Sequence, residues 1–418
     1  MSTSQMIHYA VANREILIPN FIVIATTLVL TLLLFAKPIE KSSWWAATAI
    51  PLASIIGSGF LVVAPILQMS MGVYAPFAMT GLVTVAYLIG AAIRFNIHHV
   101  EPKLAAGTLH PAPHTLEILS QWALAFAYVV SVTYYLALFG DFALRGVNVV
   151  NPILSHTITT AILIFIAVYG RYRGFNFLGR FEAVKLGIIG GLLAGLAYGN
   201  YHAWAQQLWH LPPVKEPTLH DWRIVLGMLI VVQGFETSRY LGDKFPPMLR
   251  IRTMRYAQWI SAGIYIVYIT LMLYYFNYPL PPEGQDTAII TLSRHVATVL
   301  PVMLLALALI AQFDAAIADA QGGAGLFEEL SKRKITVNTG YIIIAVGGIL
   351  IVWSSNIFQI ITYASQAFAV YYMLQSMVAA LTAAKHEDIP HRWPKFFGFA
   401  LVASLAATVV IFGIPAGG

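Results

Sequence analysis

Apolar runs long enough to cross a lipid bilayer recur along almost the whole of this sequence. They lie at about 16–36, 46–70, 74–93, 118–139, 152–170, 183–200, 222–241, 256–277, 297–325, 337–354, 357–381 and 396–415. A helix needs roughly 20 mostly apolar residues to span the hydrocarbon core, and lipid offers no partner to unpaired backbone groups. The runs therefore predict an all-α membrane protein with about twelve transmembrane helices.

Composition excludes several other classes of protein. Hydrophobic residues make up 59% of the chain and charged residues 10%, which is more apolar surface than a soluble domain buries. The absence of cysteine excludes disulfides, thiolate metal sites and cysteine catalysis. The histidines are scattered and form no His-Glu-x-x-His motif, and no P-loop occurs. We therefore expect no metal, no cofactor and no enzymatic activity.

The positive charges follow the loops rather than forming one patch. If the 37–45 loop is cytoplasmic, alternate loops carry 18 of the 24 lysines and arginines. Cytoplasmic loops of membrane proteins are enriched in these residues. The net charge of +6 thus indicates orientation and not nucleic-acid binding. The pattern predicts both termini outside, with the bacterial inner (plasma) membrane as the expected location.

Two blocks of five spans, 46–200 and 222–381, have nearly equal length. An odd number of spans inverts the second block relative to the first. Each block opens with an interrupted run, at the Gly-Ser-Gly of 57–59 and at Gly234. Matching interruptions in two halves are typical of inverted-repeat transporters and mark their binding sites. The remaining predicted parts are an N-terminal segment with one extra helix (1–45), an outer loop (201–221), and a cytoplasmic loop with the final helix (382–418).

Three motifs in these blocks resemble one known family. "IIGSGFLVVAP", "FEAVKLGIIGGLLAG" and "GFETSRYLGDKFPPMLR" are similar to the first, fifth and sixth repeat helices of the amino acid–polyamine–organocation (APC) superfamily. The resemblance covers about 46–381. It implies a LeuT-like fold with a 5+5 inverted repeat, here with one extra helix before the repeat and one after it.

The first interruption is a candidate substrate site formed by Ile56, Gly57, Ser58 and Gly59. A break in mid-membrane exposes backbone N–H groups at the positive end of the second half-helix, where a carboxylate can dock. Glycine allows the ligand to approach the backbone closely. The resemblance implies the same carboxylate site. The alternative is a small-residue contact between helices.

The second interruption, Gln233, Gly234, Phe235 and Glu236, is the candidate partner site. Unwound carbonyls here can receive a substrate ammonium, and Phe235 can cover the site. An ionisable group such as Glu236 inside a span is costly and is functional by default. The resemblance associates an acid at this position with gating or proton sensing. The alternative is a structural carboxylate paired with Arg239, three residues on.

Lys185, Asp314 and Asp319 are the other candidate coupling residues. The resemblance implies that Lys185 can place its ammonium where sodium-coupled relatives bind sodium, although its side chain can also snorkel to the interface. Asp319 is expected at a depth that suits Lys185, with Asp314 nearer the midplane. Either acid can be a proton site, an ion-pair partner, or a group packed against a polar group of another helix. Four glycines, 187, 191, 195 and 199, predict a stripe for close helix packing.

These features together predict a secondary transporter that moves an amino acid or related amine by alternating access. Proton coupling or exchange is expected rather than sodium coupling, so the partners are a small-molecule substrate, protons and the lipid bilayer. A nucleobase or an inorganic cation carried by the same fold is the alternative. A membrane-embedded sensor or enzyme is a further alternative. The sequence shows neither the output domain expected of a sensor nor the catalytic cluster expected of an enzyme. The oligomeric state is left open.

Overall fold

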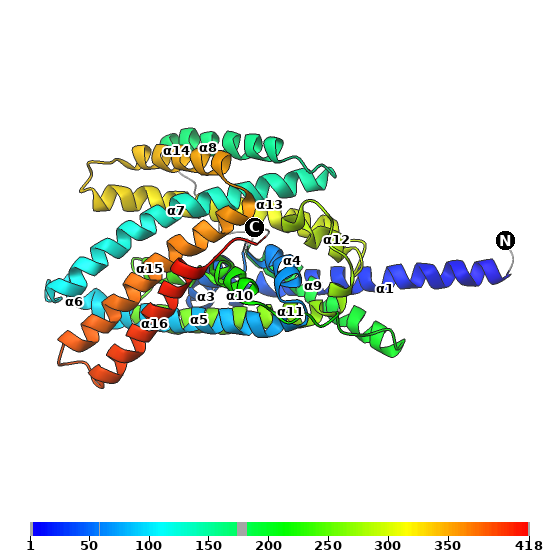
Figure 1. The fold of residues 1–418 in the computed structure, drawn as a ribbon, viewed down its shortest axis with the longest axis horizontal. Coiled ribbons are helices and arrows are strands. Elements are labelled where there is room, and N and C mark those ends of the chain that lie inside the picture. The colour runs from blue at the N-terminus through cyan, green and yellow to red at the C-terminus, as the bar shows by residue number, and fades with distance from the viewer. Residues whose placement is uncertain (1–2, 58, 174–181, 417–418) are drawn as a thin grey trace.

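The chain folds into a bundle of helices in a computed structural model that describes residues 3–57, 59–173 and 182–416. Within these ranges every regular element is a helix (Figure 1). The all-α prediction is therefore confirmed. Ser58, one of the candidate site residues, lies outside the described residues.

The α-helices are α1 (Thr3–Leu34), α2 (Lys37–Glu40), α3 (Ser43–Ile55), α4 (Phe60–Ser70), α5 (Ala75–Phe95), α6 (Glu101–Ala105), α7 (Pro111–Gly146), α8 (Pro152–Arg173), α9 (Glu182–Ala205), α10 (Leu219–Leu226), α11 (Pro247–Met272), α12 (Ile289–Ser293), α13 (Leu300–Leu330), α14 (Val337–Ser354), α15 (Ile357–Lys385) and α16 (Arg392–Phe412). Short helical turns are η1 (Gly72–Tyr74), η2 (Asn96–Val100), η3 (Leu229–Val232), η4 (Phe235–Leu241), η5 (Tyr274–Asn277) and η6 (Gln285–Thr287).

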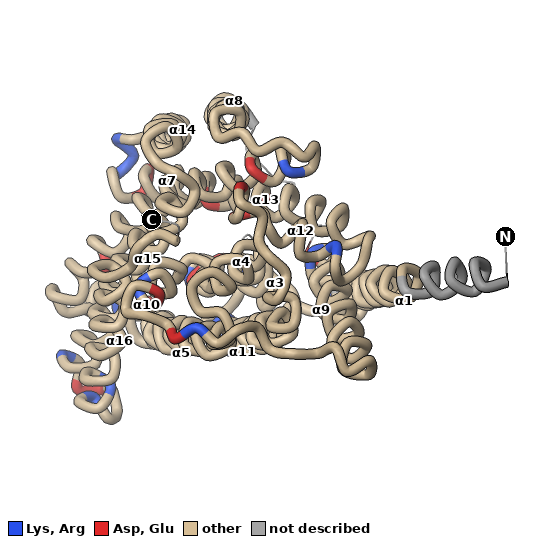
Figure 2. Tube along the Cα trace, turned by 45° about the vertical axis from the view of Figure 1, so that its right-hand side comes forward, with Lys and Arg blue, Asp and Glu red and all other residues tan. Residues whose placement is uncertain are grey.

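Ten helices of the described chain are long and apolar enough to cross a membrane, or eleven if α3 and α4 form one broken span. The predicted span at 222–241 is not a continuous helix. It consists of α10, the turn η3, an extended Gln233 and the turn η4. This is an integral, multi-pass membrane protein, and its charged residues occupy few positions along the helices (Figure 2).

The glycines of α9 form the predicted packing stripe. A Cβ added to Gly187 would lie 2.9 Å from the carbonyl oxygen of Thr27, and one added to Gly191 would lie 2.8 Å from that of Val23. These glycines therefore let the backbone of α9 approach α1 closely. The opposite face of α1 is exposed, with Phe21 72% accessible, as expected of a helix that faces lipid.

The two ends of the bundle carry different loops. In Figure 1, α6 and the turn from α15 to α16 lie at the left, whereas α12 lies at the right. The charge pattern predicts these as the cytoplasmic and outer ends, respectively. The long helix α7 runs between the two ends and packs against α13, α15 and α8. Helix α7 therefore contributes residues at both ends of the bundle.

Candidate functional site

The first helix break lies between α3 and α4. Ile56 ends α3 through a backbone hydrogen bond to Leu52, and Gly59 is the N-cap of α4 without a capping side chain. A Cβ added to Gly59 would lie 2.5 Å from the Cα of Val231, a residue of η3. A residue larger than glycine would therefore collide with the backbone of the second break.

The second break turns at Gly234, between η3 and η4. Its φ of 113° lies in the left-handed region that favours glycine. A Cβ here would lie 2.7 Å from the carbonyl carbon of Ser54, on the last turn of α3. Each break therefore has a glycine against the backbone of the other, although about 175 residues separate them in the sequence.

Tyr265 of α11 links the two breaks. Its hydroxyl lies 3.0 Å from the carbonyl oxygen of Ile55 and 2.5 Å from that of Val231, so its one proton serves both. Both carbonyls belong to backbone that has left regular helix. The predicted pairing of the two interruptions is thus present, and this tyrosine holds them together.

Glu236 is buried beside the second break. Its carboxylate accepts the backbone N–H of Gly234 at 2.9 Å and the hydroxyl of Tyr372 at 2.8 Å. Phe235 stacks on the same tyrosine, with ring centroids 5.3 Å apart. Glu236 forms no ion pair with Arg239 in the described chain, so the alternative of a structural pair at i+3 is wrong. The turn η4 directs the two side chains to different partners.

Gln233 has an incomplete set of hydrogen bonds. Its amide nitrogen donates to the hydroxyl of Tyr135 at 2.8 Å. Its amide oxygen has no hydrogen-bond partner among the described residues. A buried acceptor without a donor costs free energy, so this oxygen is available to a ligand that carries a donor.

A cavity of about 10 Å³ lies beside the breaks and is lined by Ile55, Val232, Gln258 and Tyr265, among other residues. This volume suits about one water molecule. The residues that line this cavity do not include Gly57, Gly59, Gln233 or Glu236.

Lys185 forms ion pairs with Glu182 at 3.0 Å and with Asp314 at 3.3 Å. The expectation that Asp319 suits Lys185 is therefore wrong. Successive residues turn by about 100° around a helix, so acids five positions apart face different neighbours. Asp314 faces α9, whereas Asp319 accepts a hydrogen bond from Ser131 of α7.

Comparison with known proteins identifies the family. The sequence model of the APC superfamily transporters matches residues 37–413, which include both helix breaks. The chain belongs to this family. A protein of Aquifex aeolicus (strain VF5), described as uncharacterized, is 38% identical over 399 residues, which are 94% of this chain and 96% of the relative. Family membership confirms the resemblance seen in the three motifs.

An ionic network lies at the predicted cytoplasmic end of this APC superfamily member. Arg239 pairs with Glu117 at 2.9 Å, and Arg250 pairs with Glu101 at 2.6 Å. Gln375 of α15 hydrogen-bonds both Arg239 and Glu117. The network ties η4 to α6, α7, α11 and α15 at this end of the bundle.

The sequence motifs did not reveal most of these partners. Three of them are tyrosines that lie within apolar runs and belong to no recognisable motif: Tyr135, Tyr265 and Tyr372. Only the packing of their helices brings them to the breaks. Glu117 carried one signal, since it is an acid at the edge of a predicted span. No group of three or more His, Cys, Asp or Glu in the described residues suits a metal ion.

Proposed function

We propose that this chain is a secondary active transporter that moves an amino acid or related amine across the bacterial plasma membrane by alternating access. The contact between the two helix breaks carries the proposal. Glycines at both breaks and the shared hydroxyl of Tyr265 bring two stretches of unwound backbone together inside the membrane. Irregular backbone at membrane depth is tolerated where it serves a binding site.

The breaks offer the two ends of an amino acid complementary partners. The first turn of α4 starts at Gly59 without a capping side chain, and its N–H groups carry the positive end of an 11-residue helix. These N–H groups suit a carboxylate, which would dock beside Ile56 and Gly57. The free amide oxygen of Gln233 and the carbonyls near Gly234 suit an ammonium group. Phe235 covers the second break.

The ion pairs favour a proton or an exchange mechanism over sodium coupling. Lys185 is a fixed cation between Glu182 and Asp314 at the position where the resemblance implies a sodium ion in relatives. Glu236 and Asp319 are acids inside the membrane that form no ion pair with a Lys or Arg in the described chain. Such carboxyls are candidates for proton uptake and release.

The test is uptake by the purified protein in proteoliposomes, after a thermal-shift screen of amino acids, amines and nucleobases. A ligand that binds the native state raises the melting temperature. We expect an amino acid or amine to stabilise the protein and to be transported. Stabilisation and uptake of nucleobases alone would instead support the alternative substrate class. A protein that transports no compound that it binds would contradict the transporter proposal.

A further inference from the structure

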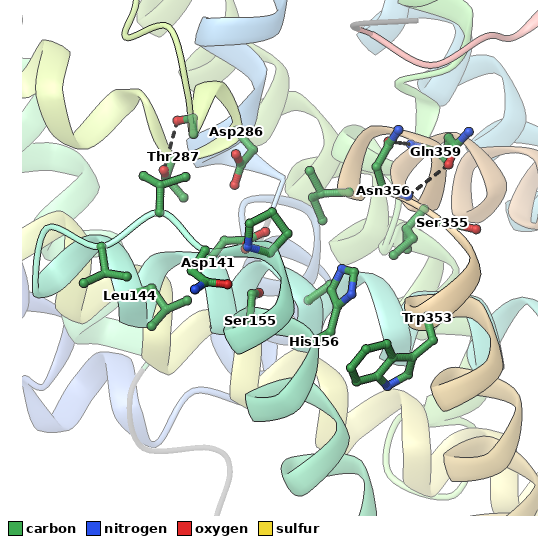
Figure 3. A pocket seen from close by; sticks show the side chains of 18 of the residues that line it. Asp141, Leu144, Ser155, His156, Asp286, Thr287, Trp353, Ser355, Asn356 and Gln359 are labelled. Atoms are coloured by element: carbon green, nitrogen blue, oxygen red, sulfur yellow. Dashed lines mark hydrogen bonds between the residues drawn. The ribbon is translucent and has the colours of Figure 1, made fainter.

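A separate cavity opens at the predicted outer end of the bundle. Its volume is about 380 Å³, within the range of roughly 300–1,000 Å³ that is typical of small-molecule sites. It lies between the end of α7, the start of α8, the turn η6 and the α14–α15 junction (Figure 3). The cavity does not include the residues of the two helix breaks. It is therefore a second place where a ligand can bind.

Two carboxyl groups line this cavity, Asp141 of α7 and Asp286 of η6. Asp286 is only 6% exposed, yet its Oδ2 receives no hydrogen bond from the described residues. The carboxyl of Asp141 interacts with that of Asp286, whose other polar neighbours are the backbone N–H groups of residues 286 and 287. Two carboxyls can share a hydrogen bond only when one carries a proton. Neither carboxyl has a cation at ion-pair distance among the described residues.

The charges around the pair leave room for a cationic partner. No Lys or Arg is among the residues that line the cavity, and neither acid forms an ion pair in the described chain. Arg145 attracts Asp286 from a longer distance, while its guanidinium donates to Thr291 at 2.6 Å. A buried, unpaired carboxylate is costly. A ligand that brings a cation would remove this cost.

The rest of the wall suits an organic ligand. Trp353 and His156 meet edge to face, with ring centroids 5.4 Å apart, and the Trp353 indole is fixed by a hydrogen bond to Thr160. Aromatic faces attract organic cations. The remaining walls are mostly apolar or neutral, with Leu144 and Ile360 among the apolar residues.

We propose that this cavity binds a small organic cation, with its ammonium at Asp141 and Asp286 and its apolar body along Trp353. A metal ion fits less well, because calcium takes six to eight oxygen ligands and this wall offers two acids. An anion would meet the two carboxyls and no Lys or Arg in the cavity wall. The site is additional to the proposed transport site, and its binding test does not depend on transport.

The proposal sets the direction of the pH dependence. Burial raises the pKa of Asp286, which lies outside the membrane-spanning helices. The amine is a cation throughout, so it competes with the proton that the two carboxyls share at low pH. His156, when protonated, also repels a cation. Arg145 lies near Asp286 but is not among the residues that line the cavity. Every group that titrates here therefore favours tighter binding as the pH rises.

The experiment measures binding of radiolabelled benzylamine to the purified full-length protein, with benzyl alcohol as the neutral competitor. We expect tighter binding at about pH 8 than at about pH 5, and no competition by the alcohol. Asp286→Asn and Asp141→Asn should each weaken binding at least about tenfold. Glu283→Gln, an exposed acid in the same loop, is the matched control and should bind as the unmodified protein does. Competition by the alcohol, or unchanged binding in both aspartate variants, would overturn the proposal.

A second measurement keeps the proposal testable if the aspartate variants fail to fold. The native chain has no cysteine, so Ser355→Cys places one thiol in the cavity wall. Benzylamine should slow its reaction with a membrane-impermeant thiol reagent by several-fold, whereas benzyl alcohol should not. Glu216→Cys, on the exposed outer loop, should react at the same rate with or without the amine. Equal protection of both thiols, or of neither, contradicts the site. Glu236→Gln should leave this protection unchanged, which separates the cavity from the helix-break site.

Discussion

At Gly234 the backbone is left-handed, and a Cβ would meet the backbone of Ser54. Gly234→Ala therefore adds both backbone strain and a collision, and we expect a loss of about 1–3 kcal/mol in the free energy of unfolding with loss of transport. The measurements are thermal unfolding and uptake. The matched control is Gly263→Ala in α11, where a Cβ meets nothing within 4 Å. It should stabilise the protein by about 0.5–1 kcal/mol and leave transport intact. Equal effects of the two substitutions would contradict this role of Gly234.

At the same scale, Glu236 accepts one backbone and one tyrosine hydrogen bond and forms no ion pair with a Lys or Arg in the described part of the chain. Glu236→Gln keeps the shape but cannot change charge. We expect it to flatten the pH profile of uptake more than it weakens substrate binding, because a proton that shifts a conformational equilibrium need not contact the substrate. Asp319→Asn is the parallel variant. If Glu236→Gln keeps the native pH profile and Asp319→Asn flattens it, the proton role belongs to Asp319.

Among the elements, η4 connects the helix break to the ionic network. Arg239 on η4 pairs with Glu117 of α7, and Arg250 of α11 donates to the backbone carbonyl of Arg239 at 2.8 Å. Movement of η4 would therefore have to break buried ion pairs. A buried charge left without its partner is costly, so under the proposed transport cycle the network would favour the state in which this end stays packed.

Arg239→Gln should accordingly increase access from the predicted cytoplasmic side. Ser238→Cys reports on this, because the serine is buried next to Arg239. In inside-out vesicles, we expect its thiol to react several-fold faster in the Arg239→Gln background. Lys103→Gln breaks an exposed pair with Asp388 at the same end and should leave the rate unchanged. A rate that is the same in all backgrounds would show that the network does not hold this end closed.

The elements also show how far sequence patterns reach. The lengths of the apolar runs predicted the helices. Glycines in the middle of two of these runs predicted the breaks, because a backbone polar group without a hydrogen bond is costly in lipid. The partners of Glu236 and Lys185 escaped prediction. These contacts depend on which faces of α13, α7 and α15 pack together. Because these helices are long, apolar and only weakly amphipathic, the sequence does not determine how each is rotated about its axis. The five-residue spacing of Asp314 and Asp319 indicates that they lie on different faces of α13. It does not show which of them faces α9.

At the scale of the whole molecule, the ion pairs of Lys185 bear on the energy source for transport. The Lys185 ammonium lies between two acids on α9 and α13 and offsets part of their negative charge. We expect uptake to be unaffected when sodium is replaced by potassium, and to respond to an inward proton gradient or to substrate preloaded inside. Lys185→Ala should impair transport and lower the melting temperature, because Glu182 and Asp314 then face each other without a cation. The double variant Lys185→Ala with Asp314→Asn removes one of these acids as well and should recover part of the stability. A strict sodium requirement in the unmodified protein would contradict the role of Lys185 in replacing the ion. Loss of stability that the second substitution does not relieve would show that the two side chains are not an energetically coupled pair.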